Sequence, residues 1–183
     1  MAKVMQRMSN YSYENVNDVS KTITCPRYSN DVYALGVNLQ YYIGDMYLQL
    51  AEISQGEVKS QFKRMAVNEL EIKQQIQQKN NAYLNELLSY FYNNGGKIIE
   101  APLASEQAKE IHPFFNRIIN TFIKRLESWV VLAAEGTVTP DQLDSMISYD
   151  IIEMYGNMCK LFKVDEIDKA FEALIRVREK VRK

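Results

Sequence analysis

The chain has 183 residues, a formal net charge of −1 at pH 7, one histidine and two cysteines. This length suffices for one domain with a buried core, and the balanced charge provides no overall attraction to nucleic acids or anionic lipids. The longest unbroken apolar run, residues 129–134, is far shorter than the roughly 20 residues of a membrane-spanning helix. Two isolated cysteines and the lack of an apolar leader favour a reducing, cytoplasmic location and predict no membrane partner.

The first 30 residues differ in composition from the rest of the chain. They lack sustained apolar periodicity and are rich in Ser, Asn and Tyr, which is typical of segments that do not build a packed core alone. We interpret residues 1–30 as an arm that is partly disordered, or ordered by a protein partner such as a neighbouring subunit. Residues 31–183 are then a single helical-bundle domain.

Two helices are predicted in the first half of the chain, over residues 31–54 and 57–92. The first carries apolar side chains at steps of three and four and has Asp31 as a candidate N-cap. Ser54 and Glu57 have the spacing of a capping box, and Gly56 between them permits a tight turn. The second helix would be about 50 Å long, well beyond its predecessor, so its far end needs another partner.

Three further helices are predicted over residues 105–135, over residues 140–162, and from residue 165 to the carboxyl end. Pro113 either kinks the first of these or marks the start of its main part. That helix has a wide apolar face, which indicates cover on more than one side. Thr139, Pro140 and Gln142 fit the N-cap, N1 and N3 positions of a helix start. The fold class is therefore all-α.

The first and last pairs of helices can be aligned as an internal repeat. An offset of 108 residues aligns Tyr47 with Tyr155, and after one inserted residue an offset of 109 aligns Phe62 with Phe171. The second offset also aligns Glu69 with Arg178. Each of these two is the one charged residue that interrupts the apolar stripe of its helix.

The first predicted hairpin contains the sequence DMYLQLAEISQGEVKSQFKRMAVNELEIKQQI, residues 45–76. Through Tyr47, residues 50–52, Phe62, Met65 and Glu69 this stretch resembles the first helical hairpin of the ferritin-like superfamily, rubrerythrins in particular. The resemblance implies a four-helix bundle that holds two metal ions, with a Glu from each of two helices and Glu-x-x-His from each of the others. Here an additional long helix lies between the two repeated hairpins.

Most of the ligands that the resemblance implies are missing from this chain. Gln40 and Ser148 stand at the first Glu position of each half, Glu69 and Arg178 at the second, and Ile72 and Val181 at the His position. A metal pair needs carboxylates to neutralise its charge, and an arginine does the reverse. The resemblance therefore implies a degenerate dimetal site without the family's oxidase or peroxidase chemistry.

The alignment of Glu69 with Arg178 leads to a hypothesis about the core. We expect the two side chains to meet between the helical hairpins as a structural ion pair, with the guanidinium supplying positive charge. A buried carboxylate without a partner is costly, and arginine suits bidentate pairing with a carboxylate. The alternative is that Arg178 points outward near the chain end while Glu69 reaches the edge of its stripe.

A second arrangement of carboxylates remains open at the sequence level. Glu127, Asp150 and Glu153 lie near the apolar stripes of the third and fourth predicted helices. Together with Glu69 they provide four carboxylates, enough for a hard cation if the helices bring them together. Solvated helix faces are the competing interpretation.

The sequence favours a non-enzymatic, ferritin-like helical bundle with a structural or protein-interaction role and no cofactor. Homo-oligomers are expected, because the long second helix and the wide third face leave apolar surface to cover. One alternative is a metal-binding ferritin-like oxidoreductase or storage protein that uses the atypical carboxylates. The other is a helical nucleic-acid- or capsid-associated protein that uses the N-terminal arm and the basic residues 176–183.

Overall fold

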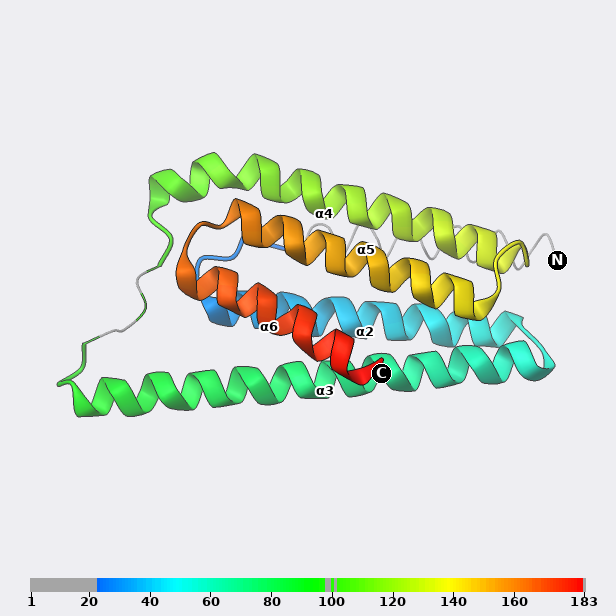
Figure 1. The fold of residues 1–183 in the computed structure, drawn as a ribbon, viewed down its shortest axis with the longest axis horizontal. Helices are drawn as coiled ribbons and strands as arrows, with labels where there is room; N and C mark the ends of the chain where they lie inside the picture. Colours follow the sequence, from blue (N-terminus) through cyan, green and yellow to red (C-terminus); the bar gives the residue numbers. More distant parts are fainter. Residues whose placement is uncertain (1–22, 98–99, 101, 183) are drawn as a thin grey trace.

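A computed structural model describes residues 23–97, 100 and 102–182. In this part of the chain, five helices and no strands are present: α2 (Ser29–Ile53), α3 (Gly56–Asn93), α4 (Ser105–Ala134), α5 (Pro140–Leu161) and α6 (Asp165–Val181), labelled as in Figure 1. The prediction of an all-α fold is confirmed. None of the helices in the described residues is apolar enough over a sufficient length to cross a membrane.

The helices form two antiparallel hairpins and one additional layer (Figure 1). The most extensive packing is between α2 and α3, while α5 packs on α6. The two hairpins meet through contacts of α6 with both α2 and α3. Helix α4 lies along α5 and has little contact with the first hairpin. The long helix α3 extends past the end of the bundle.

The start of α5 follows the predicted pattern. Thr139 Oγ1 accepts a hydrogen bond from the backbone N–H of Gln142 at 3.3 Å, and the Gln142 side chain accepts one from the Thr139 N–H at 3.0 Å. Pro140 occupies the first helical turn, where its missing N–H costs no helical hydrogen bond. The predicted capping box is confirmed.

Two other predicted N-terminal caps are wrong. Helix α2 begins at Ser29, so Asp31 is in its first turn, where its carboxylate accepts hydrogen bonds from the backbone N–H groups of Arg27 and Tyr28. Acidic side chains suit both the N-cap and the first turn, so composition alone does not separate them. Ser54 donates to the Leu50 carbonyl at 2.7 Å instead of capping α3.

Arg27 and Ser29, which belong to the predicted arm, contact a later part of the chain. Of the predicted arm, residues 1–22 are outside the described residues. Arg27 exchanges two hydrogen bonds with Leu103, from the Leu103 N–H to the Arg27 carbonyl at 3.0 Å and from Arg27 Nη2 to the Leu103 carbonyl at 3.2 Å. Glu100 Oε1 accepts hydrogen bonds from the N–H and hydroxyl of Ser29 at 2.8 and 2.7 Å. The chain before α2 is thus joined to the α3–α4 connection.

The core is continuous between the two hairpins and includes the inner face of α4. Pro113 lies inside α4, eight positions after Ser105, so it does not mark the start of this helix. Large side chains from α2, α3, α5 and α6 fill the centre; the largest are Tyr47, Phe62, Tyr155, Phe171 and Arg178. One of these side chains, that of Arg178, is charged, so the centre of the core contains polar contacts as well as apolar packing.

Candidate functional site: a buried polar centre

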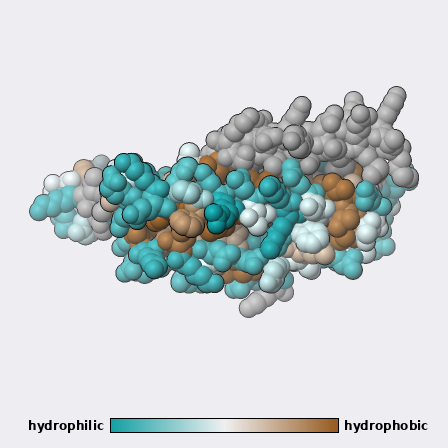
Figure 2. Space-filling model, turned by 90° about the horizontal axis from the view of Figure 1, so that it is seen from above, coloured by the Kyte–Doolittle hydropathy of each residue, from teal (hydrophilic) through white to brown (hydrophobic). Residues whose placement is uncertain are grey.

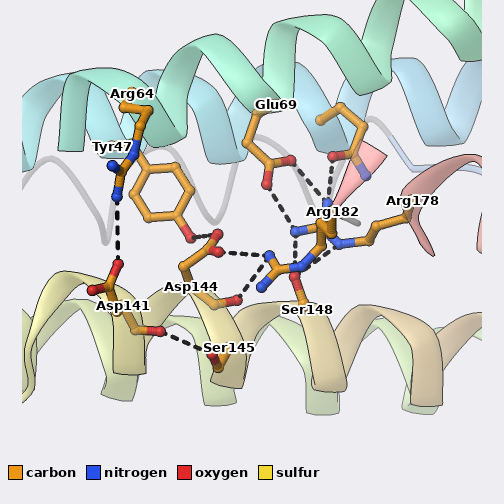
Figure 3. A network of polar contacts seen from close by, with 10 residues as sticks. Tyr47, Arg64, Glu69, Asp141, Asp144, Ser145, Ser148, Arg178 and Arg182 are labelled. Carbon is orange, nitrogen blue, oxygen red and sulfur yellow. Dashed lines mark hydrogen bonds and ion pairs between the residues drawn. The ribbon is translucent and has the colours of Figure 1, made fainter. Parts of the chain in front are cut away.

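Arg178 is fully buried near the end of α6, and its guanidinium points into the bundle toward Glu69 of α3 (Figure 3). Nη1 donates to Glu69 Oε2 at 2.9 Å, and Nη2 donates to Oε1 at 2.8 Å. The Glu69 carboxylate is also buried, with 1% of its surface exposed. This bidentate arrangement is the strongest common geometry for an arginine–carboxylate pair.

Two further helices complete the coordination of the guanidinium. Ser148 Oγ, on α5, accepts from Arg178 Nε at 3.1 Å and from Nη2 at 2.9 Å. Gln40 Oε1, on α2, accepts from Nη1 at 2.8 Å. A guanidinium has five N–H donors, and all of them are used here. We call Gln40, Glu69, Ser148 and Arg178 the polar centre; each of its members comes from a different helix.

Electrostatics keep the arginine charged in this apolar setting. Burial by itself lowers the pKa of Arg178, but the charge and hydrogen bonds of Glu69 more than offset that effect, so the pKa lies above the ordinary arginine value. The guanidinium is therefore protonated throughout the physiological range. A charged group with every donor paired avoids most of the penalty of an unsatisfied buried charge.

A second set of polar contacts lies beside the polar centre. Tyr47 donates its phenolic proton to Asp144 Oδ1 at 3.0 Å, and Arg182 Nη1 contacts Asp144 Oδ2 at 2.7 Å (Figure 3). Burial raises the pKa of Tyr47 well above its ordinary value, and the nearby charge of Asp144 adds to the effect. The tyrosine therefore remains a neutral hydrogen-bond donor, and Asp144 joins α2 to the end of α6.

Not every buried polar atom at the polar centre has a hydrogen-bond partner. Gln40 Nε2 and Tyr155 Oη are buried without a hydrogen-bond partner of good geometry in the described part of the chain. Burial raises the pKa of Tyr155 to about 12, against smaller lowering effects of Arg178 and Gln40. Tyr155 aligns with Tyr47 in the sequence repeat, but only Tyr47 has a carboxylate for its hydroxyl.

The carboxylates of the alternative metal site are placed differently. Asp150 and Glu153 both bind Arg125 of α4, and Asp150 Oδ2 also accepts from Trp129 Nε1 at 2.7 Å. Partial burial raises the pKa of Glu127, with a smaller lowering effect of Lys124. Among the described residues, no three His, Cys, Asp or Glu side chains are grouped to hold a metal ion. The four carboxylates are not brought together.

The basic end of the chain is largely engaged within the domain. Arg178 belongs to the polar centre, Arg182 pairs with Asp144, and Arg176 pairs with Glu172 one turn earlier at 3.2 Å.

Sequence reasoning placed Glu69 and Arg178 together but missed Arg182, Asp144, Arg125 and Trp129. Arg182, Asp144 and Arg125 are polar residues next to an apolar stripe, a signal that is common on solvated helix faces, whereas Trp129 belongs to the apolar run of residues 129–134.

The fold and the polar centre define an all-α bundle with a fully hydrogen-bonded guanidinium in its core. No protein-family model matches the chain, and no curated protein or solved structure matches it.

Proposed function

We propose that this protein is a non-enzymatic, ferritin-like helical bundle with a structural or protein-interaction role, in which an arginine replaces a metal pair. The observation that carries the proposal is the position of Gln40, Glu69, Ser148 and Arg178. These are the four positions that the resemblance assigns to metal-binding glutamates, and they meet at one place with one residue from each of four helices. Their meeting at one place supports the resemblance to a bundle with a central dimetal site.

The chemistry of the polar centre favours a structural role over metal binding. Glu69 is its only carboxylate, and both carboxylate oxygens already accept from Arg178. Divalent metals in such bundles are held by several carboxylates and neutral histidines. A cation in this place would have to displace Arg178 or lie against its positive charge. The guanidinium instead supplies the charge compensation that Glu69 requires.

The ion pair also fixes how the two hairpins fit together. Glu69 and Gln40 belong to the first hairpin, while Ser148 and Arg178 belong to the second. A shift of either hairpin by one helical turn, about 5 Å, would leave a buried charge without its partner. Buried ionic groups contribute little net stability compared with apolar packing, but they penalise alternative arrangements. We therefore assign the polar centre the function of selecting one arrangement of the bundle.

Elemental analysis of the purified full chain, expressed with added iron, manganese and zinc, tests this proposal. We expect the metal content of the wild type to be far below one ion per chain, and equal to that of the Glu69→Gln variant. Glu69→Gln removes the only carboxylate of the centre with little change of shape. The proposal is overturned if the wild type retains a metal at molar ratio and the Glu69→Gln variant loses it.

A further inference from the structure

We draw no further inference here: the strongest candidate, the patch of exposed apolar side chains near the end of α3 (Leu84, Leu88, Tyr90, Phe91 and Tyr92), where the molecule tapers in Figure 2, carries nothing, because nothing in the part of the chain that the structure describes shows what covers it.

Discussion

The polar centre and the ion pairs of Arg125 with Asp150 and Glu153 are arginine–carboxylate contacts in two different environments. Arg178 and Arg125 each bind carboxylates on neighbouring helices, yet the Arg178 side chain is completely buried while that of Arg125 is 46% exposed. Arg125 has water available for its remaining donors. Arg178 depends entirely on Glu69, Gln40 and Ser148. A solvent-exposed ion pair stabilises the folded protein little, because water can solvate either charge when the other is removed. Loss of one partner from a buried pair leaves an uncompensated charge in the core.

Arg178→Met should have the largest effect, because it leaves the Glu69 carboxylate buried without a partner. We expect the free energy of unfolding to fall by about 3–5 kcal/mol, measured by urea denaturation followed by circular dichroism. Arg176→Met is the matched control: Arg176 lies on the same helix, pairs with Glu172, and is 62% exposed. It should unfold like the wild type, and equal losses in both variants would remove the distinction between buried and exposed pairs.

The next effect is a pH dependence that only a buried group can produce. Burial raises the pKa of Tyr155 from 10.0 to about 12 in the folded protein. Between these values the unfolded chain gives up its proton first, so rising pH favours unfolding. The stability from the neutral tyrosine is complete below pH 10 and lost on the way to pH 12.

We therefore expect the unfolding free energy of the wild type to fall by about 2–3 kcal/mol more than that of Tyr155→Phe over this range. Parallel urea titrations of the two proteins below pH 10 and near pH 12 measure the difference. Identical pH profiles would show that the Tyr155 hydroxyl reaches water in the folded protein.

Tyr47→Phe should produce a smaller loss at neutral pH. The substitution removes the hydrogen bond to Asp144 from a buried hydroxyl, for which we expect about 1–2 kcal/mol. Asp144 keeps its contact with Arg182, which limits the effect. Tyr155→Phe provides the internal control, since the Tyr155 hydroxyl has no partner of good geometry to lose. The prediction fails if Tyr155→Phe is the more destabilising of the two.

Arg125→Met should have the smallest effect. Asp150 keeps its hydrogen bond from Trp129, and Glu153 is accessible to water. We expect the free energy of unfolding to fall by only a small fraction of the loss seen for Arg178→Met. This fall should be smaller still in high salt, which screens exposed charges. Thermal unfolding at low and high ionic strength measures both. A loss as large as that of Arg178→Met would mean that exposure does not determine the strength of these pairs.

The sequence predicted the features that depend on one helix alone, and the contact that follows from the cost of burying a charge without a partner. Steps of three and four between apolar residues located all five described helices, and the start at Thr139 has a local signature. Glu69 and Arg178 could be paired because each interrupts an otherwise apolar stripe, and a buried charge requires compensation. The long helix was also expected to need a further partner at its far end.

The remaining contacts depend on how the helices are rotated and shifted relative to one another. Asp144 meets Tyr47 and Arg182 only because the two hairpins pack in one particular register. Trp129 begins the longest apolar run of the chain, and nothing in the sequence indicated that its indole N–H would select Asp150. The start of α2 was misplaced because Asp31 is compatible with two neighbouring cap positions.

A double-mutant cycle with Glu69→Gln and Arg178→Met tests most directly whether the two residues act as one compensated pair. Each single substitution should destabilise the protein strongly, because it leaves the opposite charge buried alone. The double variant should be more stable than the sum of the two losses predicts, with a coupling energy of at least about 2 kcal/mol. A coupling energy near zero would contradict the proposed role of Arg178 as the charge partner of Glu69.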